Sequence, residues 1–371
     1  MPPRTVEHTM DYRSCISTVR ALADGEETFL AALERAPAFD PQVFAAFLER
    51  HRLVAWVAPV LGSERVRRAL PAAFLREAGE RAPARRQRTE RLLADCLQMR
   101  AAFAQDGLDC LLLKGLVFGQ RFYGDISRRH QQDVDILVRS AELPAALATL
   151  ERLGYAKDEG RIGEGAVRRS LSRGDSEVDV HWNLRRRARR RIDEETLWAS
   201  RARLQLGGQV FETLGDEHAL LFLLLAMCGD LRRGACPVRC FLDLYLLLRH
   251  AARTQGRELD WEAFLARRQA EALHKPCVNV LALFLAVWPV AAEFPGLAAA
   301  IGKRRRLVQL RDTQEAVAIV ERPRGNPENQ LWFQRAYPYD ALSDWTRRLT
   351  RDLPRTLDRL RPSRTFALPQ D

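Results

Sequence analysis

The chain has 371 residues, a length that corresponds to about two or three domains of ordinary size. Hydrophobic residues make up 47% and charged residues 29%, a composition that excludes a wholly disordered or fibrous protein. The 59 Lys and Arg residues outnumber the 48 Asp and Glu residues. The resulting net charge of +11 favours an anionic partner such as a nucleotide, a nucleic acid or a membrane surface, without choosing among them.

The cysteines and the apolar runs indicate where the protein works. The 7 cysteines are odd in number and lie mostly in apolar stretches, as is typical of reduced thiols in a cytoplasmic protein. Cys236 and Cys240 have no second pair or His at zinc spacing, so we expect no zinc site there. The N-terminus lacks an apolar signal core, and the most apolar run, Ala219–Met227, is far shorter than the ~20 residues that span a bilayer. The sequence therefore predicts a cytoplasmic location and no membrane partner.

Residues 1–105 are predicted to form an N-terminal helical region. Apolar residues recur at helical spacing, as in Phe29-Leu30-Leu33 and Phe44-Phe47-Leu48. Arg85–Phe103 is typical of one long, strongly charged helix. Prolines are expected at the starts of helices in this region, at Pro37, Pro41, Pro59, Pro71 and Pro83.

Residues 106–215 are predicted to form a small α/β core. Short apolar or alternating runs indicate strands at Leu108–Leu113, Asp133–Val138, Ser176–Trp182 and Gln209–Thr213. Helical segments are expected from Gly115 to Tyr123 and from Ala141 to Leu153, the second closed by Gly154.

Residues 216–371 return to a helical pattern. The clearest helices are expected at Glu217–Met227, Phe241–His250 and Trp261–Arg268, and the apolar stretch Ala272–Val290 is expected to be buried. A loop is expected at Glu321–Asn329, and a helix followed by a tail in roughly the last thirty residues. The predicted fold class is therefore α+β, with a small mixed sheet and its helices between two helical regions.

Two aspartates on one predicted strand carry the chemistry. Asp133 and Asp135 are two residues apart, so their side chains face the same way, opposite the apolar Val134 and Ile136. Two adjacent carboxylates repel each other unless a cation lies between them. Mg²⁺ prefers oxygen ligands and commonly binds one or two carboxylates together with substrate phosphates.

The strand at Ser176–Trp182 adds a third carboxylate. Asp179 and His181 share one face of it, and Asp179 completes a three-carboxylate cluster if this strand pairs with the first. Such a cluster is suited to two-metal phosphoryl transfer. Upstream, Lys114 and Gly115 lie at a strand-to-helix junction, where glycine permits close approach of a phosphate and lysine adds a positive charge.

The order of these motifs resembles a known family. Lys114-Gly115, the helix that ends at Tyr123, Arg129, Asp133-x-Asp135 and the later Asp179-Val-His181-Trp are similar to the uncharacterised bacterial nucleotidyltransferase family of the DNA polymerase β-type superfamily. The resemblance extends to His51-Arg-Leu-Val near the start and to a closing segment at residues 353–362.

The resemblance implies a polymerase β-like core and a metal-dependent transfer of an NMP group, expected to be AMP, from an NTP to an acceptor hydroxyl with release of pyrophosphate. It implies that Asp133, Asp135 and Asp179 hold two Mg²⁺ ions, and that Gly115 is the phosphate-loop glycine. In this interpretation Lys114 and Arg129 bind the phosphates, and His181 orients a ligand or acts as a base on the acceptor side. The acceptor is a small molecule, a peptide or a protein.

Several alternatives stay open at this point. Arg129 either binds the triphosphate or pairs with Asp133 or Asp135, and Asp243 either lines the cleft or pairs with an arginine. Leu116, which stands where the superfamily has Gly or Ser, favours a non-catalytic binding or scaffold protein on a degenerate fold. The net charge of +11 favours an RNA-directed transferase. The arginine run at residues 185–191 is either a solvated helix face or a group that attracts phosphates or contacts nucleic acid.

Overall fold

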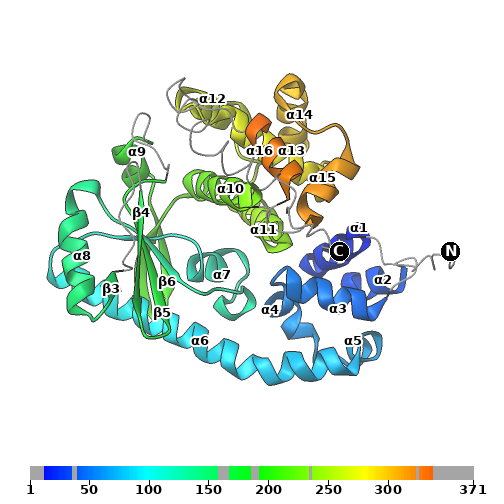
Figure 1. The fold of residues 1–371 in the computed structure, drawn as a ribbon, viewed down its shortest axis with the longest axis horizontal. Coiled ribbons are helices and arrows are strands. Elements are labelled where there is room, and N and C mark those ends of the chain that lie inside the picture. Colours follow the sequence, from blue (N-terminus) through cyan, green and yellow to red (C-terminus); the bar gives the residue numbers. More distant parts are fainter. Residues whose placement is uncertain are drawn as a thin grey trace, which may run out of the picture.

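The protein is built around a mixed sheet, drawn at the left of Figure 1. The computed structural model describes residues 12–35, 40–157, 167–184, 192–233, 236–322 and 326–336. Within these ranges the sheet has 7 strands in the order β3-β4-β5-β2-β1-β7-β6. The strands are β1 (Leu111–Leu112), β2 (Val134–Leu137), β3 (Ala156–Lys157), β4 (Arg168–Arg173), β5 (Ser176–His181), β6 (Ala202–Leu206) and β7 (Gln209–Thr213).

The middle of the sheet is the position of β2. This strand pairs antiparallel with β1 and parallel with β5, and all its residues are buried. The strand β5 continues from β4 through a tight turn at Gly174, where φ is +55°. A residue on β2 therefore has direct neighbours on a strand that begins about 40 residues later in the sequence.

The N-terminal helices precede the sheet and lie at the right of Figure 1. Helix α3 begins at Pro41, and the Asp40 side chain caps it by accepting hydrogen bonds from the backbone N–H groups of Gln42 and Val43. The helices of this part are α1 (Tyr12–Ala21), α2 (Glu26–Arg35), α3 (Pro41–Arg50), α4 (Val54–Val57), α5 (Glu64–Ala69) and α6 (Ala72–Gln105), with 3-10 turns at Leu22–Asp24 and Ala58–Val60.

Helix α6 is 34 residues long and runs from the N-terminal helices to the sheet, along the bottom of Figure 1. It contains Pro83, which is not at a helix start, so that prediction is wrong for this proline. A proline ring in a helix collides with the carbonyl four residues earlier, here that of Gly79. The Arg85 side chain donates a hydrogen bond to the neighbouring Ala78 carbonyl at 2.7 Å, which satisfies one acceptor in the disturbed turn.

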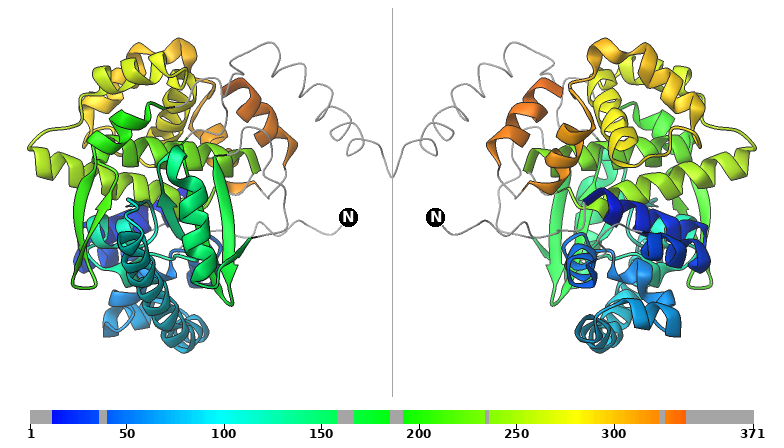
Figure 2. Two further views of the ribbon diagram at one scale, coloured as in Figure 1. Left: turned by 90° about the vertical axis from the view of Figure 1, so that its left-hand side faces the viewer. Right: turned by 90° about the vertical axis from the view of Figure 1, so that its right-hand side faces the viewer.

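The helices inserted between the strands cover the sheet. Figures 1 and 2 show α8 on one side of the strands, and α7 lies on the other side, against α11. These helices are α7 (Leu116–Phe122), α8 (Leu143–Arg152) and α9 (Glu194–Ala199), with 3-10 turns at Ile126–Arg128 and Ser140–Glu142.

The C-terminal helices form a layer above the sheet and the N-terminal helices in Figure 1. They are α10 (Asp216–Arg233), α11 (Val238–Gln255), α12 (Trp261–Ala270), α13 (His274–Val287), α14 (Pro295–Lys303), α15 (Thr313–Glu321) and α16 (Pro327–Ala336), with a 3-10 turn at Arg305–Leu307. In the described part of the chain, no helix combines the length and the hydrophobicity needed to cross a bilayer.

The α+β class and the four predicted strands are confirmed. The predicted helices that fall within the described residues are present as well, and α10 and α11 extend beyond their predicted ends. Pro37 and the final helix, expected in roughly the last thirty residues, lie outside the described residues. The predicted loop at Glu321–Asn329 is wrong at its end, because α16 begins at Pro327. The strands β3, β4 and β6 were not predicted. The arginine run at 185–191 and the closing segment at 353–362 lie outside the described residues.

Candidate active site

Strand pairing brings two of the predicted carboxylates together. In the parallel register of β2 and β5, Asp135 is the direct partner of Asp179, and Leu137 is the partner of His181. Both aspartates are buried, with residue exposures of 2%. The carboxylates of Asp135 and Asp179 and the imidazole of His181 each offer a ligand atom, and these atoms lie within 4.8 Å of one another. We call these three residues the Asp-Asp-His cluster.

Asp133 stands beside this cluster rather than in it. It precedes β2, its side chain is 28% exposed, and it is linked to Asp135 through the ammonium group of Lys114. Nζ of Lys114 lies 3.0 Å from Oδ2 of Asp135 and 3.6 Å from Oδ2 of Asp133. The ammonium group of Lys114 therefore occupies the space between the two carboxylates where the sequence predicts a metal ion.

The charges of the cluster are strongly coupled. Burial acts to raise the pKa of Asp135, but the Lys114 ammonium and the contact with His181 hold that pKa well below its usual range. Nε2 of His181 lies 3.1 Å from Oδ1 of Asp135, at hydrogen-bond distance. Burial also disfavours the charged form of Lys114, yet Asp135 and Asp133 raise its pKa above the usual value. Asp135 is thus a carboxylate that stays ionised.

Asp179 has a different environment. Burial and the negative charge of Asp135 raise the pKa of Asp179, while Arg168 and Ser170 on the neighbouring strand β4 act against this rise. A guanidinium nitrogen of Arg168 lies 2.6 Å from Oδ2 of Asp179, and the Ser170 hydroxyl donates to Oδ1. The Arg168 side chain is 41% exposed, so solvent reaches the group that pairs with the buried carboxylate.

Sequence reasoning missed Arg168 and Ser170, because β4 carries few apolar residues. Its one fully buried side chain is Leu171, and its remaining residues are Arg and Ser. The alternation of Arg168, Ser170 and Ser172 along one face is a weak indication of a strand in a segment of low β-propensity. The stronger signal is Gly174-Asp175, a two-residue turn typical of a hairpin, directly before the predicted strand at Ser176.

Gly115 has a backbone conformation that glycine adopts and other residues resist. It caps α7 with φ +69° and ψ −117°, and a Cβ at this position would lie 3.5 Å from the Asp133 carbonyl oxygen. The space would admit a methyl group, so the backbone angles and not crowding explain the glycine. They bring Lys114 and the first turn of α7 next to the carboxylates.

Arg129 lies elsewhere than predicted. Its guanidinium is buried and donates two hydrogen bonds of 2.8 Å to Asp243 of α11, and the Tyr123 hydroxyl donates to the same carboxylate at 2.7 Å. The alternative pairing of Arg129 with Asp133 or Asp135 is wrong, since Asp243 holds its planar fork, and the predicted phosphate contact of Arg129 stays a prediction. Of the two alternatives for Asp243, pairing with an arginine is confirmed.

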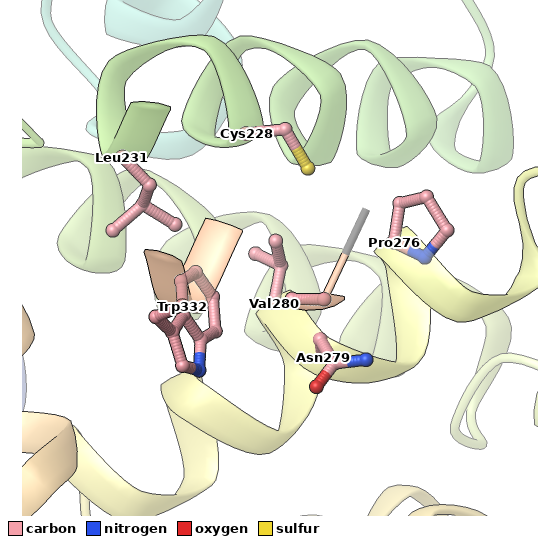
Figure 3. A pocket seen from close by; sticks show the side chains of 7 residues that line it. Cys228, Leu231, Pro276, Asn279, Val280 and Trp332 are labelled. Carbon is pink, nitrogen blue, oxygen red and sulfur yellow. The ribbon is translucent and has the colours of Figure 1, made fainter. Parts of the chain in front are cut away.

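A separate pocket lies between α10, α13 and α16 (Figure 3). It has about 180 Å³ of empty volume, part of it open to solvent, and its lining includes Cys228, Val280 and Trp332. None of its lining residues belongs to the Asp-Asp-His cluster. The pocket has no charged side chain in its lining, and the Asn279 amide is already hydrogen-bonded to Lys275, Leu307 and Gln309.

A comparison with solved structures finds weak likenesses to part of this chain. Two solved structures are similar to part of the chain. The antibiotic-resistance factor ANT(2″)-Ia in solution shares 14% identity and a TM-score of 0.34, covering 58% of this chain and 96% of that one. A crystal structure of ANT(2″)-Ia in complex with adenylyl-2″-tobramycin shares 15% identity and a TM-score of 0.35, covering 48% and 96%. Both likenesses are too weak to carry an inference about this chain.

The sequence itself gives the assignment. A comparison with curated protein sequences gives no match. The profile of a family described as uncharacterised nucleotidyltransferase matches residues 37–289, more than half of the 371 residues. That span contains the whole sheet and every residue of the Asp-Asp-His cluster. The chain therefore belongs to the uncharacterised nucleotidyltransferase family and is an enzyme that transfers nucleotidyl groups.

Proposed function

We propose that this enzyme moves an NMP group, AMP from ATP in the first instance, to a hydroxyl group of a small molecule, a peptide or a protein, and releases pyrophosphate. The observation that carries the proposal is the pairing of Asp135 with Asp179 across two parallel strands, with His181 beside them. Two buried carboxylates in contact are costly without a cation, and this chain holds cations against both.

The donor set of the cluster fits a divalent metal ion. Carboxylate oxygens are the ligands that Mg²⁺ and Mn²⁺ prefer, and an imidazole is acceptable to Mn²⁺. Asp135, Asp179 and Asp133 would hold two Mg²⁺ ions, with His181 as a further ligand or an orienting group. A bound metal ion supplies a Lewis acid for the phosphate oxygens and lowers the pKa of the attacking hydroxyl.

The protein's own groups have separate roles in the proposal. Asp179, which lies beside Asp135 and His181, accepts the proton of the acceptor hydroxyl as a general base. Lys114 moves from the carboxylates to the phosphates when a metal ion takes its place. Its ammonium cannot pair fully with the carboxylates and with the phosphates at the same time. Gly115 lets the first turn of α7 approach the phosphates closely.

The proposal places the enzyme in the cytoplasm. Its support is the set of seven free cysteines, since disulfides form and persist in oxidising compartments.

The test is a transfer assay with each α-labelled NTP, Mg²⁺ and a cell extract, followed by separation of the labelled products. Asp135→Asn and Asp179→Asn should each lower the rate at least about 100-fold, because each removes a metal-binding charge worth several kcal/mol in the transition state. Asp175→Asn is the matched control, since Asp175 lies in the β4–β5 turn with a side chain 84% exposed. The proposal is refuted if Asp135→Asn and Asp179→Asn transfer the label as fast as the control Asp175→Asn does.

A second candidate function is a binding protein with a degenerate site. The observation that favours it is that Lys114 and Arg168 already neutralise both buried carboxylates. This alternative expects no NTP-dependent labelling and no effect of Mg²⁺ on the stability of the protein. The exposure of Arg168 favours the enzyme, because an exposed guanidinium is displaced at little cost.

A further inference from the structure

Three arginines from distant parts of the chain converge on the loop that leads into Asp133. Arg52 follows α3, and its Nη1 donates a hydrogen bond of 3.2 Å to the side-chain oxygen of Gln132. Arg88 of α6 donates to the Gln132 carbonyl at 3.0 Å, and Arg239 of α11 donates to the His130 carbonyl at 2.8 Å. We call Arg52, Arg88 and Arg239 the arginine cluster.

In the described part of the chain, the hydrogen bonds of the arginine cluster go to uncharged groups. Among the described residues none of the three forms an ion pair with a carboxylate; they donate to neutral oxygens instead. The Nε atoms of Arg88 and Arg239 are buried and have no hydrogen-bond partner in the described part of the chain. Elsewhere in the protein even exposed arginines pair with acids, as Arg65 does with Glu27.

The positive charges of the cluster act on one another and on the loop. Burial and the neighbouring Arg239 lower the pKa of Arg52, while Asp230 and Asp133 act in the opposite direction. Burial, followed by Arg239 and Arg52, lowers the pKa of His130 to about 4. The arginines therefore act in the same direction as burial and keep His130 neutral.

Arg52 is also held in a conformation that arginine adopts at a cost. Its φ is +58°, in the left-handed region where Gly and Asn are favoured. The neighbouring His51 is buried and accepts a hydrogen bond from the Val238 N–H group, which fixes this turn against the start of α11. The strained turn places the Arg52 side chain on the Gln132 side of the loop, within electrostatic reach of Asp133.

We propose that the arginine cluster is a binding site for phosphate oxygens at the Asp133 edge of the active site. Guanidinium groups bind phosphate through charged, paired hydrogen bonds, and three of them with unused donors form a suitable cradle. The choice of a phosphate ligand rests on the proposed function. The phosphate belongs either to the polyphosphate tail of the NTP or to a phosphorylated acceptor.

The experiment is calorimetric titration of the full chain with inorganic tripolyphosphate, in low salt and with a chelator so that no metal ion contributes. Arg88→Ala should weaken binding at least about tenfold, the usual effect of losing a charged hydrogen bond. Arg52→Asn should do the same, and asparagine tolerates the positive φ. Arg86→Ala is the control, because Arg86 is exposed on the same helix as Arg88, and it should bind as the wild type does.

The result that overturns the proposal is a wild-type chain that does not bind tripolyphosphate, or variants that bind it equally well. Circular dichroism of each variant shows whether it is folded, and the Arg52 and Arg88 variants test the site from two separate helical elements. Asp135→Asn, which should abolish transfer, should still bind tripolyphosphate. If the wild type shows no nucleotidyl transfer but binds tripolyphosphate in a way that depends on the arginines, the proposed function is refuted and the phosphate site is not.

Competition identifies the source of the phosphate. If the cluster binds the NTP tail, saturating ATP prevents tripolyphosphate from binding. If it binds a phosphorylated acceptor, ATP and tripolyphosphate bind together, and a phosphorylated dinucleotide displaces only the tripolyphosphate. Both results support a phosphate site, and they separate its two ligands.

Discussion

Arg129 and Asp243 form a buried ion pair through two parallel hydrogen bonds of 2.8 Å, which joins the loop before Asp133 to helix α11. Burial opposes the charges of both groups, and each partner nevertheless favours the charged form of the other: the pKa of Arg129 is raised and that of Asp243 is lowered. The Tyr123 hydroxyl completes the coordination of the carboxylate. The loop on which the arginine cluster converges is therefore attached to α11 from inside the core.

Asp243→Asn should destabilise the protein strongly, because it leaves the buried Arg129 charge without a counter-ion. The expected loss is about 3–5 kcal/mol of unfolding free energy, measured by urea denaturation at pH 7. Glu27→Gln, which breaks the exposed pair with Arg65, is the control and should change stability little. An Asp243→Asn protein as stable as the wild type would show that Arg129 finds another partner.

Mn²⁺ should bind to the Asp-Asp-His cluster without nucleotide. Electron paramagnetic resonance measures the free ion directly, and Asp179→Asn should weaken binding at least about tenfold by removing one charged ligand. Asp175→Asn should bind Mn²⁺ as the wild type does, since its exposed carboxylate lies outside the cluster. If both variants bind equally, the metal ion lies elsewhere.

Arg168→Gln should strengthen the binding of Mn²⁺. Arg168 competes with a metal ion for Asp179, and the contribution of such a partly exposed pair is at most about 1 kcal/mol, equivalent to about a fivefold change in affinity. Arg168→Lys keeps the charge and should stay close to the wild type in the same measurement. Weaker binding in Arg168→Gln would instead make Arg168 a supporting residue of the site.

Gly115→Ala should cost about 1–3 kcal/mol of stability, because an alanine at φ +69° and ψ −117° is strained. Gly256 offers a matched comparison: its φ is +67°, but its ψ of 8° is in the left-handed helical region that other residues can enter. Gly256→Ala should therefore cost less in the same urea titration. The transfer rate should fall only in Gly115→Ala, since Gly256 ends α11 far from the carboxylates in sequence.

The stability of the protein should fall as the pH decreases from about 6.5 toward 4. Burial lowers the pKa of His51 to about 3 and that of His218 to about 4, below the usual value near 6.5 of the unfolded chain. In this window the unfolded chain binds more protons than the folded one, so acid favours unfolding. The contribution of the neutral histidines to the free energy of unfolding is complete above pH 6.5. It is lost as the pH falls through the pKa values of His51 and His218 in the folded protein. Urea denaturation at pH 7 and pH 5 measures the slope, and His51→Gln should reduce it.

The sequence predicts the central strands and the carboxylates because their patterns are local. Val134, Ile136, Val178 and Val180 alternate with acidic residues, and alternation alone assigns both the strand and the face. The parallel register that sets Asp135 against Asp179 was a condition in the sequence argument, and the structure fulfils it. The sequence could not predict which residues form ion pairs with one another. Arg168 meets Asp179, and Arg129 meets Asp243, only through tertiary contacts.

The misplaced features have physical reasons too. Proline disrupts the interior of a helix, so the sequence predicts Pro83 at a helix start. In the structure Pro83 is exposed within the 34-residue helix α6, where its ring disturbs the carbonyl of Gly79, four residues earlier. The arginines of the cluster are spread over 187 positions from Arg52 to Arg239, and nothing in the sequence distinguishes them from other arginines of this basic chain.

The length of α6 limits how this protein can be dissected. Its second half buries Leu92, Cys96, Met99 and Phe103 and contacts α7, α8 and β5. Its first half lies beside the N-terminal helices in Figure 1, where Arg81 pairs with Glu49 of α3. Cutting the chain near residue 105 would strip an apolar wall from the sheet that bears Asp135. A minimal fragment for crystallisation or for engineering therefore has to begin before Ala72, and a shortened gene that starts at the sheet should yield insoluble protein.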